Sequence, residues 1–170
     1  MSARPATPPA ISMGEIVVEI ADFAVAGGEA VLVTAGLGSC VALVLHDRST
    51  GIAGLAHILL PAVGTGPASI HPAKYAETGV PLLVEEMRRN GARGRLVAKM
   101  AGGARMFGAL LSSGINMGQR NIEATRSALA RLGIEIVAED VGGEYGRSVR
   151  VDAATGAVRV RSLVGGDRDL

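Results

Sequence analysis

Short runs of β-branched and other apolar residues dominate the first third of the chain and predict four strands. These strands are expected at 15–20, 30–34, 41–46 and 52–60. Residues 47–51, Asp-Arg-Ser-Thr-Gly, have turn chemistry, so the last two strands should form an antiparallel hairpin. Cys40 begins one arm of that hairpin and His57 lies late in the other, which places the two residues roughly opposite each other.

The rest of the chain combines helical and strand patterns. Apolar positions at helical spacing predict helices over 73–90 and 121–132, the second with Asn121 as its N-cap. Glycines at 91 and 133 end these helices. Further strands are expected at 95–100, 134–138, 148–151 and 157–160. Strands in quantity with two substantial helices predict an α/β or α+β fold.

The length of 170 residues suits one domain, which the pattern places at 13–163. Residues 1–12 carry three prolines and no apolar run, so we expect a disordered tail that is not a signal peptide. Residues 164–170 are expected to be frayed. No apolar stretch reaches the roughly 18 residues that a membrane span needs. We therefore expect a cytoplasmic protein without membrane insertion.

Composition narrows the function mainly by exclusion. A net charge of +1 and an aromatic content of 2% give neither attraction nor stacking platforms for nucleic acid. One cysteine cannot form an internal disulfide, which fits a reducing compartment. His46, His57 and His71 show no paired ligand spacing, so we expect no metal and no cofactor. We expect a monomer.

The single cysteine, Cys40, ends a glycine-rich turn, and it is the best candidate for a nucleophile. A free thiol has a pKa of about 8.5, so at neutral pH it needs a base to become reactive. His57 is the nearest candidate base, and the hydroxyl of Thr34 is placed to orient its ring. A lone cysteine and a lone histidine in apolar runs are, however, more often packing residues than catalysts.

The turn itself suggests an oxyanion site. Gly36 and Gly38 allow backbone N–H groups, including that of Ser39, to converge on a concave site. Such donors stabilise the oxyanion of a tetrahedral intermediate, which points to acyl transfer through a thioester. The same glycines resemble the start of a dinucleotide-binding motif. We reject that interpretation, because a short strand rather than a helix follows and no acidic residue lies about 20 residues on.

Beyond the turn, the whole chain over about 15–162 resembles the chemoreceptor glutamine deamidase family, CheD. The matching blocks are T-x-G-L-G-S-C-V-A at 34–42, G-L-A-H-x-x-L-P at 54–61, K-Y at 74–75, A-K-M-A-G-G-A-R-M at 98–106, I-N-M-G-Q-R-N at 115–121 and D-V-G-G-E-Y-G-R-S-V at 140–149. The blocks occur in order and without large gaps, so their combination is far more specific than the cysteine turn alone.

The resemblance implies an α/β fold of two packed mixed β-sheets flanked by helices, similar to the catalytic domain of cytotoxic necrotizing factor toxins. It implies a catalytic set that maps to Cys40, His57 and Thr34. It also implies that glutamine side chains of methyl-accepting chemotaxis proteins are converted to glutamate, which then serves as a methylation site in adaptation. A CheC-type phosphatase of the response regulator CheY is a partner of some members.

Several alternatives stay open from the sequence. The chain could be a non-catalytic binding partner of a CheC-type phosphatase or of a receptor, and a methyl-esterase activity would use the same thioester. Glycine pairs 102–103 and 142–143 are expected in tight turns or close approaches near the site, and Arg147 is expected at the surface. A Leu/Met-rich group is either core or a partner surface; it contains Met100, Met106, Phe107, Leu110 and Leu111.

Overall fold

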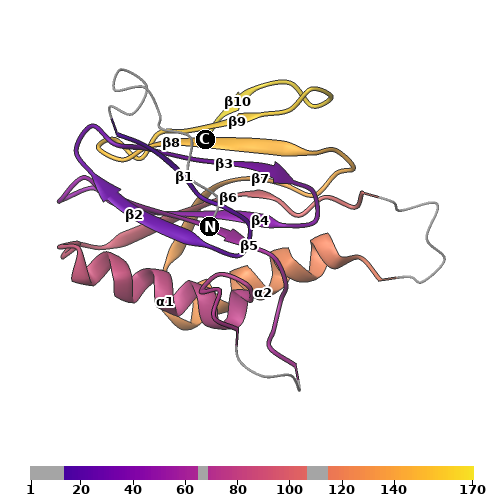
Figure 1. The fold of residues 1–170 in the computed structure, drawn as a ribbon, viewed down its shortest axis with the longest axis horizontal. Helices are drawn as coiled ribbons and strands as arrows, with labels where there is room; N and C mark the ends of the chain where they lie inside the picture. The colour runs from indigo at the N-terminus through magenta and orange to yellow at the C-terminus, as the bar shows by residue number, and fades with distance from the viewer. Residues whose placement is uncertain (1–13, 65–68, 107–114) are drawn as a thin grey trace.

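The computed structural model describes residues 14–64, 69–106 and 115–170, which form two β-sheets and two helices in three layers (Figure 1). The first sheet has the order β1 (Glu15–Val17), β3 (Val31–Leu37), β8 (Arg147–Asp152), β9 (Val158–Arg161) and β10 (Arg168–Asp169). The second has the order β2 (Phe23–Gly27), β5 (Ile52–Ile58), β4 (Val41–Asp47), β6 (Leu96–Gly102) and β7 (Glu135–Val141). The helices are α1 (Ala76–Arg89) and α2 (Met117–Arg131).

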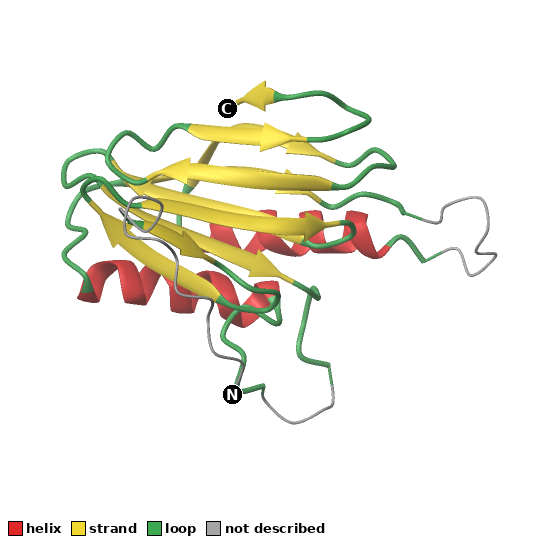
Figure 2. Ribbon diagram, turned by 45° about the horizontal axis from the view of Figure 1, so that its top comes forward, coloured by secondary structure: helices red, strands yellow, loops and turns green. Residues whose placement is uncertain are grey.

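Both sheets are mixed. The pairs β1–β3 and β6–β7 are parallel, and the other strand pairs are antiparallel. The helices lie together on the outer face of the second sheet, and the first sheet covers its other face (Figures 1 and 2). The predicted α/β fold with two packed mixed sheets is therefore confirmed, with helices on one side only. Its likeness to the toxin domain stays a prediction.

Strand β4 lies in the middle layer, between two apolar cores, and all its residues are buried. Val41, Leu43 and Leu45 pack toward the helices. Ala42 and Val44 alternate with them and pack toward the first sheet. Because successive side chains of a strand point to opposite faces, a strand covered on both faces needs an unbroken apolar run. This is why the sequence of β4 lacks polar alternation.

The predicted hairpin is confirmed as β4 and β5, with Ala42 opposite His57. Strand β2 was not predicted, because three of its five residues are Ala or Gly, which are depleted in strands, and pairing with β5 selects it. The N-cap prediction at Asn121 is wrong: helix α2 begins four residues earlier, and the side chain of Asn116 accepts the hydrogen bond from the Gln119 N–H. Asn121 lies inside the helix.

The end of the chain is more ordered than the expected fraying of 164–170. Strand β10 pairs with β9, and the Leu170 N–H donates to the carbonyl oxygen of Val158 at 2.8 Å. The Lys99 ammonium donates to the Leu170 carbonyl oxygen at 2.6 Å. The predicted tail at 1–12 lies outside the described residues.

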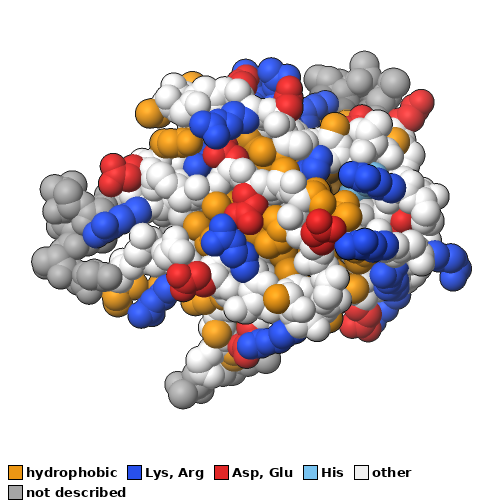
Figure 3. All heavy atoms as spheres, turned by 180° about the vertical axis from the view of Figure 1, so that it is seen from behind, with side chains coloured by type: hydrophobic (Ala, Val, Ile, Leu, Met, Phe, Trp, Pro, Cys, Tyr) orange, Lys and Arg blue, Asp and Glu red, His pale blue; other side chains and the backbone are white. Residues whose placement is uncertain are grey.

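The surface carries interspersed charges of both signs on the face opposite that of Figure 1, with apolar side chains between them (Figure 3). This distribution fits the net charge of +1. Neither α1 nor α2 is long and apolar enough to span a membrane, and these are the helices of the described residues. Of the Leu/Met-rich group, Met100 is buried in the core and Met106 is exposed, while the members between 107 and 111 lie outside the described residues.

Candidate active site

The glycine-rich turn carries the chain from one sheet to the other. Strand β3 ends at Leu37 in the first sheet and β4 begins at Val41 in the second. Gly36, with a φ of +70°, lies where the register of β3 against β8 shifts, so it forms a bulge that favours glycine. Residues 38–40 therefore make the crossing that brings Cys40 to the space between the sheets.

The crossing is fixed by backbone hydrogen bonds to the end of β6. The Gly103 N–H donates to the Cys40 carbonyl oxygen at 2.7 Å, and the Ala104 N–H donates to that of Gly38 at 2.8 Å. Gly102 and Gly103 both have positive φ, and a Cβ at Gly102 would overlap the Cys40 carbonyl oxygen. The expected role of this glycine pair in close backbone approach is thus confirmed.

The sheets bring Thr34 and His57 into direct contact. Thr34 lies on β3 and His57 on β5, and both side chains are buried between the sheets. The Thr34 Oγ1 lies 2.8 Å from the His57 Nδ1 and donates its own hydrogen to the Val18 carbonyl oxygen at 2.7 Å. A hydroxyl has one hydrogen, so Thr34 must accept from Nδ1–H. This assigns the proton of neutral His57 to Nδ1 and leaves Nε2 as a lone pair.

The Nε2 atom of His57 has the free lone pair that a general base needs. Nε2 is buried and has no hydrogen-bond partner among the described residues. Burial lowers the pKa of His57 below its ordinary value of 6.5, because the low-dielectric interior disfavours the imidazolium. His57 is therefore neutral at pH 7 and able to accept a proton.

Cys40 lies diagonally across from His57 on the same face of the sheet. Its neighbour two positions on, Ala42, pairs directly with His57, and Cys40 and Ala42 pack in the same core. Diagonal neighbours in a sheet lie within reach of long side chains. Burial raises the pKa of the Cys40 thiol above its ordinary value of 9.0, an effect that a hydrogen bond from its own N–H partly offsets. The resting pair is thus a neutral thiol and a neutral imidazole.

A pocket of about 370 Å³ opens beside Cys40. Its lining residues are Gly36, Gly38, Ser39, Cys40, Ala104, Arg105, Met106, Ile115, Asn116, Met117 and Gly118. His57 does not line it and is fully buried. An incoming carboxamide would therefore meet the thiol from the pocket, whereas His57 is shielded from solvent.

The backbone N–H groups of the turn before Cys40 differ in whether they already donate a hydrogen bond. The Gly38 N–H donates to the Gly36 carbonyl oxygen at 3.2 Å and is thus used within the turn. The N–H groups of Ser39 and Cys40 have no backbone acceptor in the described parts of the chain. The Ser39 N–H is therefore the available donor for an oxyanion, and the Cys40 N–H is a second donor once it leaves its own sulfur. Gly36 and Gly38 shape the turn around them.

Two residues for which the sequence predicted other roles support the site. The first, Asn121, is fully buried on α2, and its Nδ2 donates to the carbonyl oxygens of Ser39 at 2.9 Å and Leu59 at 3.0 Å. The sequence predicted it as a helix N-cap, and its place in the I-N-M-G-Q-R-N block was the one signal that linked it to the family. The side-chain bonds join residues far apart along the chain, so no local pattern reveals them.

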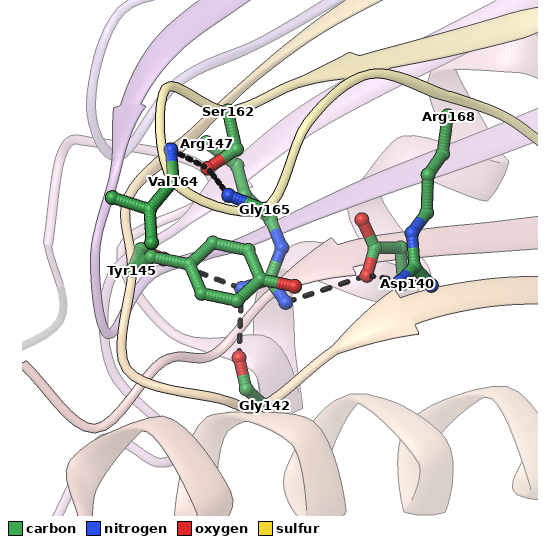
Figure 4. A network of polar contacts seen from close by, with 8 residues as sticks. All are labelled: Asp140, Gly142, Tyr145, Arg147, Ser162, Val164, Gly165 and Arg168. Carbon is green, nitrogen blue, oxygen red and sulfur yellow. Dashed lines mark hydrogen bonds and ion pairs between the residues drawn. The ribbon is translucent and has the colours of Figure 1, made fainter.

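The second is Arg147, whose expected surface position is wrong (Figure 4). Its side chain is buried, with Nη1 donating to the Gly142 carbonyl oxygen at 2.8 Å and Nη2 lying 3.4 Å from Asp140 Oδ1. Its guanidinium lies 4.3 Å from the centre of the Tyr145 ring. The Gly142 N–H donates to the Gly102 carbonyl oxygen at 2.9 Å, so this network stabilises the segment that holds the cysteine turn.

Comparisons with known proteins point to one family. A family model described as CheD chemotactic sensory transduction matches residues 59–162. A relative from Pyrococcus abyssi, named probable chemoreceptor glutamine deamidase CheD, is 46% identical over 153 residues, covering 89% of this chain and 94% of its own length. A relative of the same name from Desulforamulus reducens is 45% identical, covering 88% of this chain and 91% of its own length.

The chemoreceptor glutamine deamidase CheD of Thermotoga maritima is 44% identical over 153 residues, covering 89% of this chain and 94% of its own length. The family model begins after Thr34, Cys40 and His57. The pairwise alignments, in contrast, are long enough on a chain of 170 residues that they necessarily include this stretch.

Proposed function

The chain belongs to the CheD family, and from this we propose that it is a deamidase that converts glutamine side chains of chemoreceptors to glutamate, with Cys40 as nucleophile. The observation that carries the proposal is the Thr34–His57 hydrogen bond of 2.8 Å, which leaves Nε2 unpartnered on the face of the sheet that holds Cys40. A purely structural histidine would be expected to use both ring nitrogens when buried. The product glutamates would be methylation sites in chemotactic adaptation.

The first half-reaction forms a thioester. The His57 Nε2 takes the proton of Cys40 Sγ, and the sulfur attacks the carboxamide carbon of the glutamine. The carbonyl oxygen becomes an oxyanion, which the N–H groups of Ser39 and Cys40 stabilise. When the intermediate collapses, the C–N bond breaks and His57 returns its proton to the nitrogen, which leaves as ammonia.

The second half-reaction regenerates the thiol. A water molecule gives a proton to His57 and adds to the thioester carbon, and the C–S bond then breaks. The sulfur leaves with the proton from His57, and the substrate retains a carboxyl group. Thr34 keeps the ring orientation throughout, because Nδ1–H donates to its hydroxyl in the neutral and the charged state of His57.

The decisive experiment incubates a purified receptor cytoplasmic domain with the protein and, in parallel, with Cys40→Ala and His57→Ala variants. Mass spectrometry of the receptor peptides should reveal a gain of about 1 Da at specific glutamines with the unchanged protein alone, since –NH₂ is replaced by –OH. Equal conversion by Cys40→Ala would refute the cysteine mechanism. Receptor binding without conversion by the unchanged protein would instead support a binding module, the rival function.

A further inference from the structure

The β4–β5 ladder ends one residue before the proposed nucleophile. Its pairs run from Asp47 opposite Ile52 to Val41 opposite Ile58. Beyond this point the segment before β4 and the segment after β5 no longer pair, so hydrogen bonds of the β4–β5 ladder do not set the distance between them. The catalytic pair lies at this open end, because Cys40 immediately precedes β4 and His57 is the second-last residue of β5.

At the open end, the side chain of Asn121 connects the two segments in place of ladder hydrogen bonds. Its Nδ2 donates to the Ser39 carbonyl oxygen on one side and to the Leu59 carbonyl oxygen on the other, at 2.9 and 3.0 Å. Ser39 directly precedes Cys40, and Leu59 lies two residues after His57. The two hydrogen bonds therefore connect the segment that carries the nucleophile to the segment that carries the base.

The chemistry of this bridge requires a group with two donors. Two carbonyl oxygens cannot bond each other, and a carboxylate would repel both, whereas a primary amide offers two hydrogens on one nitrogen. The orientation of the amide is fixed, since the opposite one would place Oδ1 against both carbonyls. Oδ1 is consequently buried without a partner among the described residues, an arrangement that costs stability.

Helix α2 provides a rigid base for the bridge. Near its N-terminus, a Cβ at Gly118 would overlap the carbonyl oxygens of Gly103 and Ala104, so the helix backbone directly contacts the turn that holds Cys40. One turn after Asn121, the Thr125 hydroxyl donates to the Asn121 carbonyl oxygen at 2.8 Å. The contact at Gly118, and not this hydrogen bond within the helix, sets how closely Asn121 approaches the cysteine turn.

We propose that Asn121 is a positioning residue that fixes the separation of Cys40 from His57 through its two hydrogen bonds to Ser39 and Leu59. The role in turnover rests on the proposed deamidase function. The positioning itself does not, because the bridge controls how Cys40 and His57 meet whatever the substrate is. A displacement of about 1 Å at a catalytic pair lowers turnover by roughly 100-fold.

The test is the pH profile of Cys40 alkylation by iodoacetamide, which needs no receptor. The profile of the unchanged protein is expected to differ from that of His57→Ala, because His57 accepts the thiol proton. Asn121→Asp keeps the side-chain shape but removes both donors, and its profile should move to that of His57→Ala. Where the receptor is converted, kcat should fall roughly 10- to 100-fold with KM nearly unchanged.

Thr125→Val is the matched control on the same helix, because it removes a buried hydrogen bond of similar strength without touching the Cys40 turn. Its alkylation profile should match that of the unchanged protein. Asn121→Ala replaces Asn121→Asp if the buried carboxylate prevents folding. An unchanged profile in the folded Asn121 variant, or an equal change in Thr125→Val, would overturn the proposal. A shifted profile without receptor conversion would support the positioning role and count against the deamidase function alone.

Discussion

At the scale of single residues, one hydroxyl group sets the protonation of the proposed base. Thr34 has only one hydrogen, and the Val18 carbonyl oxygen takes it, so Nδ1 of His57 must be the donor in their contact. The candidate base atom Nε2 remains free because the Thr34 hydroxyl, on strand β3 of the other sheet, accepts the hydrogen bond from Nδ1. The proposed chemistry thus depends on a contact between the two sheets.

Replacing Thr34 by Val should slow deamidation by roughly 100-fold, because the isosteric side chain cannot accept from Nδ1–H and the ring loses its preferred tautomer. Thr34→Ser, which keeps the hydroxyl, should retain most of the activity. Initial rates on a receptor domain, measured by mass spectrometry, compare the two. Similar losses in both variants would mean that packing of the Thr34 methyl group, and not its hydroxyl, matters.

The pH dependence of kcat/KM should be bell-shaped. Activity requires neutral His57, whose pKa burial lowers, so the acid limb should lie below the ordinary imidazole value of 6.5. It also requires the thiol proton for the leaving ammonia, and burial raises the pKa of Cys40, so the alkaline limb should lie above 9.0. Rate measurements across this range give both limbs. An acid limb above 6.5 would contradict the neutral resting pair.

At the scale of elements, the turn after β6 determines the place of the turn before β4. The N–H groups of Gly103 and Ala104 donate to the carbonyl oxygens of Cys40 and Gly38. The buried Arg147 network holds the opposite side of the same segment through Gly142 (Figure 4). The cysteine turn is therefore positioned by segments that follow it by 60 residues and more in the sequence.

Gly102→Ala should destabilise the protein by about 2 kcal/mol or more and abolish most of the activity, because the new Cβ would overlap the Cys40 carbonyl oxygen. Gly142→Ala is the control: its φ of +81° is equally unfavourable, but a Cβ there meets open space. Urea unfolding gives the stability of both variants and receptor conversion gives the activity. Activity in Gly102→Ala equal to that in Gly142→Ala would argue against the close approach as a determinant of the site.

At the scale of the whole molecule, one end of the central strand β4 adjoins the proposed nucleophile and the other end stabilises the fold. Cys40 precedes its first residue, and Asp47 ends it about 20 Å away. The Asp47 carboxylate accepts hydrogen bonds from the backbone N–H groups of Ser49, Arg93 and Gly94 at 2.7–2.9 Å. Asp47 thereby connects the hairpin turn to the loop between α1 and β6. The Asp47 end of β4 stabilises the fold, and the Cys40 end carries the proposed chemistry.

Asp47→Ala should lower the free energy of unfolding by about 2 kcal/mol at pH 7 without changing kcat, because three backbone N–H groups lose their acceptor far from Cys40. Burial acts to raise the pKa of Asp47, but hydrogen bonds from Ser49, Gly94 and Thr50 hold it well below its ordinary value of 3.8. The stabilisation is therefore present at neutral pH and is lost as the pH falls below that value.

Urea unfolding at pH 7 and near pH 3 should therefore give a smaller difference between Asp47→Ala and the unchanged protein at the lower pH. Asp169→Ala, at an exposed ion pair with Arg159, is the control and should change stability by less than about 0.5 kcal/mol. A difference that is the same at both pH values would exclude the carboxylate as its source.

Sequence patterns predicted the local parts of this structure well. The hairpin of β4 and β5 was accessible because its apolar arms and the turn at 47–51 are adjacent in the chain. The Thr34 hydroxyl was predicted to orient the His57 ring, and its Oγ1 lies 2.8 Å from Nδ1 of His57. Strand β2, in contrast, exists through its pairing with β5, which composition does not encode locally. Nor does any local signal distinguish a buried arginine at 147 from a surface one.

By itself, the sequence determined which residues have suitable chemistry and where most of the strands and both helices form, because side-chain type and the periodicity of apolar positions are local properties. The catalytic roles of Cys40, His57 and Thr34 stay a prediction. Only the tertiary structure decided that Nδ1 of His57 carries the proton, that Asn121 bridges the two catalytic segments, and that Arg147 is buried and bonded to Gly142. Each of these depends on hydrogen-bond partners far away in the sequence, and distances between such groups arise only when the two sheets and α2 pack.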